Sequence, residues 1–275
     1  MSKRFFITYG DAKYRDSLKR IGKEAEALHL FDRVVLYSER DLPDPFKKYA
    51  EIYPRGGGYW MWKPYIIHRT LQDMEEGDVL VYADAGCTLL PHNDWNKYFD
   101  RLKHREALFF VAEGKNKRWC KHAVFMYFTP KCPGVWKAAN QIQATVMCIR
   151  KTASNEVIAR WYEAALRHPE LFTDADAKKE RPGFREHRHD QSVLTACICT
   201  SPKLGNYFFT PEKIERRYKK GQAILASRIS GDGVRGTTKA APVRSLWLDY
   251  VDLFFRNLQK FKTLFLFRLA YRLNR

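Results

Sequence analysis

The sequence predicts an α/β domain with a mixed, mostly parallel sheet, and three observations support this prediction. Short runs rich in β-branched and aromatic residues alternate with stretches of helical periodicity through the first half of the chain. The run Asp78–Ala83 is apolar on both faces, as expected of a central strand covered by helices on both sides. Of the 275 residues, 45% are hydrophobic and 15% aromatic, which allows a sizeable core and excludes a disordered chain.

The elements follow one another as such a fold requires. Helical periodicity is clear at residues 14–28, where Leu18, Ile21 and Ala25 share one face. Pro64 fits the first turn of a second helix, because its missing N–H would have no partner there. We expect strands at residues 5–9, 34–37, 78–83, 108–112 and 146–149, and helices at 14–28, 59–71 and 154–167.

The C-terminal part has a different character. Residues 227–244 contain Gly231, Gly233 and Gly236, which predicts a flexible segment between a domain at 1–226 and a tail at 245–275. The tail is basic and aromatic, and its acidic residues lie near its start, where they suit the helix dipole. Its apolar residues recur every three or four positions, which predicts an amphipathic helix: Trp247, Val251, Phe254, Leu258, Phe261 and Phe265.

The net charge predicts an anionic partner. The chain has 49 Lys and Arg against 31 Asp and Glu, a formal net charge of +18. Residues 203–275 hold 16 basic and 5 acidic residues, so the excess is concentrated towards the C-terminus. The partner would be nucleic acid, a phosphorylated small molecule or an anionic membrane.

Cysteine usage and the N-terminus indicate a cytoplasmic protein. The apolar run near Met1 is too short for a signal peptide, and no run approaches the roughly 20 apolar residues of a membrane-spanning helix. The six cysteines form no CxxC pair and lie mostly in apolar segments, so we expect buried, reduced thiols.

A carboxylate directly follows the predicted central strand. Asp84 is followed by Ala85 and Gly86. In open α/β sheets the ligand site lies at the carboxyl ends of the strands, where an aspartate can hold a divalent metal that bridges a diphosphate. The alternative is that Asp84 only caps a turn.

A glycine-rich run leads into the second predicted helix. Gly56–Gly58 precede Tyr59, Trp60 and Lys63. A helix N-terminus favours anions, so Lys63 would neutralise a phosphate while the aromatic rings offer stacking faces. The alternative is a glycine turn that leads into an aromatic core helix.

A polar cluster precedes a third apolar helix near residue 190. Asp190 is placed to cap this helix, or to bind an acceptor hydroxyl or act as a base. His187 and His189 are weaker metal candidates, because their i,i+2 spacing comes without a third nearby ligand.

Several enzyme classes are disfavoured. The sequence has no GxGxxG followed by an acidic residue, no GxxxxGK[ST] and no GxSxG. A dehydrogenase, a P-loop NTPase and a serine hydrolase are therefore not expected.

Taken in order, four motifs resemble bacterial and viral polysaccharide glycosyltransferases of the GT-A type, of the capsular polysaccharide or O-antigen kind. The resemblance implies a Rossmann-like GT-A fold, a nucleotide-sugar donor such as a UDP-sugar, a glycan or lipid-linked glycan acceptor, and a divalent metal, Mn²⁺ or Mg²⁺, at Asp84. The motifs are Phe6–Gly10 with Tyr14, Gly58–Pro64, Gly77–Cys87 and His189–Ser192.

The resemblance also implies roles by position. Asp84 and Asp190 are the catalytic candidates, with Asp84 beside the ribose, metal or diphosphate and Asp190 facing the sugar or acceptor. Apart from the resemblance, Glu113, just beyond the fourth strand, is a weaker alternative to Asp190 as the base, and Gln143 and Ala144, before the fifth strand, would contact the sugar or only pack in a loop. Donor contacts fall on Thr8, Tyr9, Gly10, Tyr14, Tyr59, Trp60, Lys63 and Asp84.

The chain departs from the family pattern at one position. The usual second aspartate of the DxD motif is Gly86, and one carboxylate is a thin site for a metal that prefers several oxygen ligands. Either Asp190 or a histidine completes the shell, or basic residues replace the metal. Arg228 and Arg235 are candidates to close over the diphosphate.

Two other functions remain open on the sequence. A nucleic-acid-binding protein would use the basic tail and bind with strong salt dependence, although the body of the chain is closer to charge balance. A non-catalytic scaffold would keep the fold without binding nucleotide sugars. The tail itself suits an anionic membrane surface, and packing on its own domain or dimerisation is the alternative.

Overall fold

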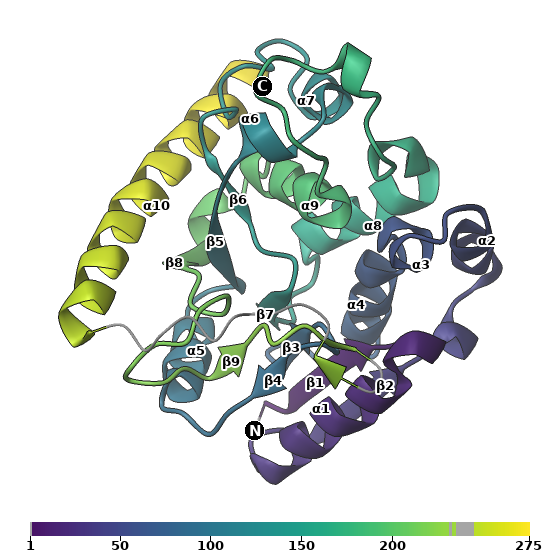
Figure 1. The fold of residues 1–275 in the computed structure, drawn as a ribbon, viewed down its shortest axis with the longest axis vertical. Coiled ribbons are helices and arrows are strands. Elements are labelled where there is room, and N and C mark those ends of the chain that lie inside the picture. Colours follow the sequence, from purple (N-terminus) through teal and green to yellow (C-terminus); the bar gives the residue numbers. More distant parts are fainter. Residues whose placement is uncertain (1, 231–232, 235–244) are drawn as a thin grey trace.

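The computed structural model describes residues 2–230, 233–234 and 245–275. Its centre is a seven-stranded sheet of order β2-β1-β3-β7-β5-β6, in which β8 also pairs with β5 (Figure 1). Two small pairs lie apart from it: β4 (Thr88–Leu89) with β9 (Ile224–Leu225), and β10 (Ile229–Ser230) with β11 (Gly233–Val234). The strands of the main sheet are β1 (Arg4–Tyr9), β2 (Arg33–Tyr37), β3 (Val79–Ala83), β5 (Ala107–Lys115), β6 (Asn140–Ile142), β7 (Val146–Arg150) and β8 (Tyr207–Pro211).

The directions of the strands confirm a mixed, mostly parallel sheet. β1 is parallel to both β2 and β3, and β5 is parallel to β8. β7 is antiparallel to β3 and to β5, and β6 is antiparallel to β5. All five expected strands are present, and the structure adds β6 and β8, which have no clear alternation in the sequence.

Helices cover both faces of the sheet, so the domain has three layers. One core lies between the sheet and α4, α8 and α9, and the other between the sheet and α1 and α5. The α-helices are α1 (Arg15–Ala27), α2 (Asp44–Ile52), α3 (Gly56–Tyr59), α4 (Trp62–Gln72), α5 (Asp94–Leu102), α6 (Asn116–Trp119), α7 (His122–Phe128), α8 (Glu156–Arg167), α9 (His189–Cys199) and α10 (Leu246–Asn274). Short 3-10 helices lie at Ala12–Tyr14, Glu39–Asp41, Pro169–Leu171, Ala177–Lys179 and Leu204–Asn206.

The expected helix at 59–71 begins later than predicted. Gly56, Gly57 and Gly58 have φ of 61°, 56° and 90°, and Tyr59 and Trp60 follow at 50° and 58°. These residues include the short α3, whose backbone is therefore left-handed rather than that of a regular α-helix. A left-handed stretch cannot continue into a right-handed helix, so α4 starts only at Trp62. A side chain at Gly58 would come within 3.0 Å of the backbone of Ala50.

The tail forms the expected helix, and its apolar stripe faces away from the body of the protein. α10 lies along one side of the molecule against β8, α9 and β6, with its C-terminal end beside α6 and α7 (Figure 1). Its buried residues include the polar Asp249, Arg256 and Thr263. The predicted apolar stripe points away from the body: Phe254, Phe261 and Phe265 are 61%, 63% and 66% exposed.

The cysteines match the prediction of buried, unpaired thiols. All six cysteines are free thiols, five of them buried and Cys132 half-buried. Among the described residues, no helix has both the length and the apolar character that crossing a bilayer requires.

Candidate active site

The strand order defines where a ligand site should lie. From β1 the chain continues to β2 on one side of it, and later returns as β3 on the other side. The carboxyl ends of β1 and β3 therefore flank a topological switch point, the usual place for a ligand in an open α/β sheet. Gly10 follows β1 and Asp84 follows β3.

The centre of this edge is the buried ammonium of Lys63, near the start of α4. Its Nζ lies 3.0 Å from Asp84 Oδ1 and 2.7 Å from Asp190 Oδ2, and it donates to the carbonyl oxygen of Ala144 at 3.2 Å. Burial alone would lower the pKa of Lys63, but the two carboxylates outweigh burial and raise this pKa above its ordinary value. Lys63 is therefore a fixed positive charge.

Asp84 is the exposed member of this cluster. Its side chain is 35% exposed, and its Oδ1 also accepts a hydrogen bond from the Tyr82 hydroxyl at 2.5 Å. The turn that follows is fixed from α1, because Arg20 donates to the carbonyl oxygens of Ala85 and Cys87 at 3.0 and 2.7 Å. One carboxylate oxygen of Asp84, Oδ2, has no partner among these contacts and is free to accept from a ligand.

Asp190 lies in the first turn of α9 and does not cap it. The N-cap position is Arg188, which makes no capping hydrogen bond through its side chain, so of the alternatives for Asp190 the capping role is wrong. Its carboxylate is engaged with Lys63 instead. Burial raises the pKa of Asp190, and Lys63 partly offsets this effect.

The aromatic residues of the left-handed turn pack against the segment that leads into α9. The ring of Tyr59 stacks on His189 with centroids 4.7 Å apart, and Trp60 lies 5.4 Å from the same ring. The Tyr59 hydroxyl donates to Asp174 at 2.6 Å. Both rings therefore position the start of α9, and with it Asp190.

The two histidines are held as neutral, hydrogen-bonded groups. His187 Nδ1 accepts from the backbone N–H of Lys121 at 3.3 Å, while Nε2 lies 2.9 Å from the carbonyl oxygen of Leu171. His189 Nδ1 lies 2.6 Å from the carbonyl oxygen of Phe172. Burial is the main cause that lowers the pKa of both histidines.

The residues expected at the nucleotide lie at the end of β1. Thr8 is fully buried, and its hydroxyl has no hydrogen-bond partner. Tyr9 is also buried, and its ring stacks on that of Trp62 with centroids 3.9 Å apart. Trp62 is the residue directly before Lys63 in the chain. Gly10 has room for no side chain, since a Cβ would lie 3.1 Å from the carbonyl oxygen of Tyr14. Tyr14 is 38% exposed and forms the outer side of this corner.

Arg228 borders the turn after Asp84. A Cβ at Gly86 would lie 3.4 Å from the Cα of Arg228, and the N–H of Ile229 donates to the carbonyl oxygen of Gly86 at 3.2 Å. The Arg228 side chain is 60% exposed and binds both carboxylate oxygens of Glu215, at 2.9 and 2.8 Å. Arg235 lies outside the described residues.

The weaker candidates are placed differently from one another. Gln143 is buried and its Nε2 lies 3.5 Å from Glu215, on the site side of the molecule. Ala144 contributes its carbonyl oxygen to Lys63. Glu113 bonds to Arg216 and Arg256, underneath α10.

Two contributing residues were missed at the level of sequence. Tyr82 could have been found, because residues i and i+2 of a strand share a face and Tyr82 is two positions before Asp84. Glu215 gave no signal, since it follows β8 in a segment without periodicity.

The residues present do not fit a divalent metal. The ammonium of Lys63 already fills the space between the two carboxylates, and Mn²⁺ or Mg²⁺ would need several oxygens at roughly 2.0–2.2 Å. Within the described part of the chain, no group of three or more His, Cys, Asp and Glu side chains is placed to hold a metal.

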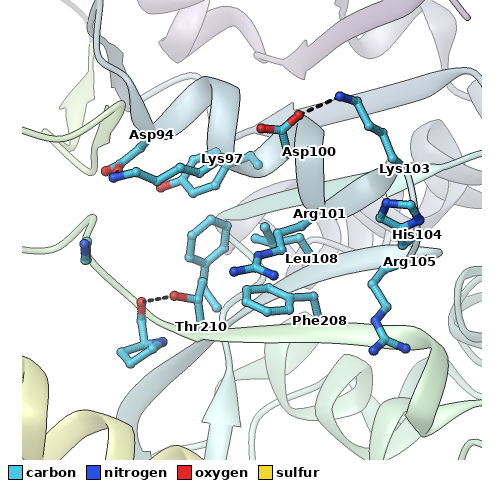
Figure 2. A pocket seen from close by; sticks show the side chains of 14 residues that line it. Asp94, Lys97, Asp100, Arg101, Lys103, His104, Arg105, Leu108, Phe208 and Thr210 are labelled. Carbon is cyan, nitrogen blue, oxygen red and sulfur yellow. Dashed lines mark hydrogen bonds and ion pairs between the residues drawn. The ribbon is translucent and has the colours of Figure 1, made fainter.

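A pocket of about 830 Å³ lies elsewhere, between α5, the start of β5 and β8. Figure 2 shows Arg101 beside the ring of Phe208, with its guanidinium 4.6 Å from the ring centroid, and the ion pair of Lys103 with Asp100. Asp84, Lys63 and Asp190 do not line it, so this pocket is separate from the cluster at the switch point.

Comparison with known proteins gives similarities of structure only. No family model and no curated protein matches the chain. A glycosyltransferase involved in the glycosylation of the major capsid of PBCV-1 is 11% identical over 86% of this chain and 95% of its own, with a TM-score of 0.46. The galactosyltransferase LgtC, in complex with donor and acceptor sugar analogues, is 11% identical over 90% and 96%, with a TM-score of 0.44. Mouse xyloside xylosyltransferase 1 is 12% identical over 78% and 87%, with a TM-score of 0.41.

Proposed function

We propose that the chain is a glycosyltransferase of the GT-A type that uses a nucleoside-diphosphate sugar, in the first instance a UDP-sugar. Its acceptor would be a glycan or lipid-linked glycan in surface polysaccharide synthesis, such as that of capsule or O-antigen. One observation carries the proposal: Lys63, Asp84 and Asp190 come from three separate motifs and meet at the switch point of the sheet.

Glycosyl transfer requires a cation for the leaving diphosphate and, in an inverting enzyme, a base for the acceptor, and this edge of the sheet has candidates for both. In glycosyl transfer the bond from the sugar C1 to the diphosphate oxygen breaks, and a bond from C1 to the acceptor oxygen forms. The departing diphosphate needs positive charge, and Arg228 is exposed beside the turn that follows Asp84. The acceptor proton needs a base in an inverting reaction, and Asp190 is the first candidate for it.

A nucleotide and nucleotide-sugar panel tests this proposal on the full chain. We expect UDP or a UDP-sugar to raise the thermal midpoint, because a ligand at 100 times its Kd stabilises by about 2.7 kcal/mol. Asp84→Asn should remove the shift and Asp100→Asn, on the far side of the sheet, should keep it. The absence of a shift with any UDP or GDP species would refute the proposal and leave a non-catalytic scaffold. A salt-dependent affinity for nucleic acid would favour the basic binding protein.

We further propose that α10 holds the enzyme on an anionic membrane, on the inner face of the cytoplasmic membrane. The apolar stripe is exposed while the carboxylates of Asp249 and Asp252 lie on the side that faces the body. Lys262, Arg268 and Arg272 are exposed on the same helix as the stripe. On such an outward face the aromatic rings can enter the membrane interface while the bases bind anionic headgroups, and no carboxylate on this face repels them.

Vesicle sedimentation tests the membrane proposal. Deleting the tail is a poor test, because Phe267 and Arg256 are buried in the body of the protein. A variant with Phe254→Ser, Phe261→Ser and Phe265→Ser keeps the packed face and should lose binding to phosphatidylglycerol vesicles. Replacing Lys262 and Arg268 by Gln should weaken binding to these vesicles. Equal sedimentation of both variants and the unaltered chain would contradict the proposal, and a dimer that the serine variant loses would assign the face to a second copy.

A further inference from the structure

The Lys63 ammonium is enclosed by partners from the protein itself. It donates a hydrogen bond to the carbonyl oxygen of Ala144 and forms ion pairs with Asp84 Oδ1 and Asp190 Oδ2, so three oxygens of the protein surround it. The Lys63 side chain is only 3% exposed. A phosphate could reach Nζ only if one of these three partners left it.

The ammonium also lies where a metal would have to lie. Both carboxylates that could reach a shared cation close on Nζ, at 3.0 and 2.7 Å. A divalent ion bridging Asp84 and Asp190 would therefore have to displace the ammonium, or share the space with a like charge. The cluster has one fixed cation and two carboxylates, so it holds its own counter-ion.

The backbone explains why no second carboxylate follows Asp84. A Cβ at position 86 would lie 3.3 Å from the carbonyl oxygen of Ile229 and 3.4 Å from the Cα of Arg228. The 228–229 segment thus occupies the space into which a side chain at position 86 would grow. Gly86 is what allows this segment to hydrogen-bond to the turn, through the N–H of Ile229.

We propose that Lys63 is the resident cation of this site and that the site has no place for a divalent metal. The inference rests on the proposed function only for the ligand, a nucleoside diphosphate, which would bind without metal. Asp84 would then offer its free oxygen to a hydroxyl of the ligand. Arg228, exposed beside the same turn and paired with Glu215, would exchange this carboxylate for the diphosphate.

Manganese titration of the full chain tests the proposal without any nucleotide. Free Mn²⁺ is followed by its electron paramagnetic resonance signal. We expect no saturable binding to the unaltered chain. We expect Lys63→Ala to bind one Mn²⁺ per chain, at least about tenfold more tightly than any binding to the unaltered chain. The reason is that the substitution leaves the two carboxylates facing an empty space. Adding Asp190→Asn to Lys63→Ala should remove the gained site.

The result that overturns the proposal is equally direct. Stoichiometric Mn²⁺ binding to the unaltered chain that Asp84→Asn abolishes would place a metal at the cluster. Should Lys63→Ala fail to fold by circular dichroism, Lys63→Met is the substitute, and the titration of the unaltered chain still decides the matter.

A calorimetric arm separates this inference from the proposed function. UDP is titrated into the unaltered chain in EDTA and, separately, in Mn²⁺. Equal affinities support the proposal, and an affinity about tenfold higher in Mn²⁺ would overturn it. If UDP binds in neither buffer, the proposed function fails, while the manganese titration still decides whether Lys63 is the resident cation.

Discussion

Two buried cations in this protein are surrounded by carboxylates, and they serve different purposes. Lys63 joins Asp84 and Asp190 at the switch point, and Arg256 joins α10 to the sheet. Arg256 Nη1 donates to Glu212 Oε1 at 2.7 Å, and its Nε lies 2.8 Å from Asp252 Oδ2. Nη2 of Arg256 also bonds to Glu113.

The difference lies in what each cluster leaves open. At Arg256 a planar guanidinium links three carboxylates, and Arg216 covers Glu113 and Asp252 from outside, so the cluster fixes a helix. At Lys63 the ammonium is enclosed by its protein partners, but about a third of the Asp84 side chain remains exposed to solvent. A saturated ion cluster indicates structure, whereas a cluster with a spare carboxylate oxygen at a sheet edge indicates a binding site.

The largest expected effect is at the switch point. Lys63→Met keeps the length of the side chain but leaves two carboxylates without their cation, which should cost about 3–5 kcal/mol of unfolding free energy in urea. The loss should shrink as pH is lowered, because burial raises the pKa of Asp190 and the carboxylate can then take up a proton. The exposed Lys97→Met is the control. A cost below about 1 kcal/mol would show that the cluster is not a tight ion group.

The second effect concerns the ion cluster of Arg256 with Glu212, Asp252 and Glu113, called the helix lock below because it fixes α10 to the body. Arg256→Met should cost about 3 kcal/mol, since it leaves Glu212, 3% exposed, without its cation. Nucleotide binding should survive in the folded fraction, because the lock lies apart from the switch point. Arg216→Met, at 30% exposure, should cost about 1 kcal/mol or less. Similar losses for both arginines would contradict the assignment of the lock to Arg256.

A smaller effect concerns His187, which is buried in the segment that leads into α9. The pKa of His187 is lowered well below 6.5 by burial, so its contribution to stability is complete above the unfolded pKa and is lost as pH falls below about 6.5. The slope should reach about 1.4 kcal/mol per pH unit for this residue. Urea unfolding at pH 7.5, 6.5 and 5.5 measures it. His187→Asn should flatten the slope, whereas the exposed His104→Asn should not.

The smallest effect on stability is expected on the outward face of α10. Phe261→Ser should change the unfolding free energy by no more than about 0.5 kcal/mol, because the ring is 63% exposed. Phe267→Ser, in the fully buried face of the same helix, should cost about 3 kcal/mol. Equal costs for the two substitutions would mean that α10 packs with the opposite face.

Much of the scaffold could be predicted from local patterns. The strand at 78–83 and the helix at 154–167 have strong periodicity, and both are present within two residues of the expected bounds. The helix at 59–71 begins later than predicted, because Gly56–Trp60 have left-handed φ, which hydrophobic periodicity does not reveal at Tyr59 and Trp60. β8 was missed because its pairing with β5 is a long-range interaction.

The candidate site was also predictable only in part. The motifs around Lys63, Asp84 and Asp190 could each be recognised as chemically unusual, and the place of Asp84 at the carboxyl end of a strand follows from an α/β fold. Their pairing could not be predicted, since Lys63 was expected to meet a phosphate and is instead closed between two carboxylates.

By itself, the sequence determined the alternation of strands and helices, the position of a carboxylate after β3 and the apolar stripe of the tail. The tertiary structure alone decided which side of α10 meets the body, because periodicity identifies a stripe but carries no information about what covers it. It also decided the partner of Lys63, because residues distant in the chain share a cation only after the sheet has assembled and water has been excluded from their contact.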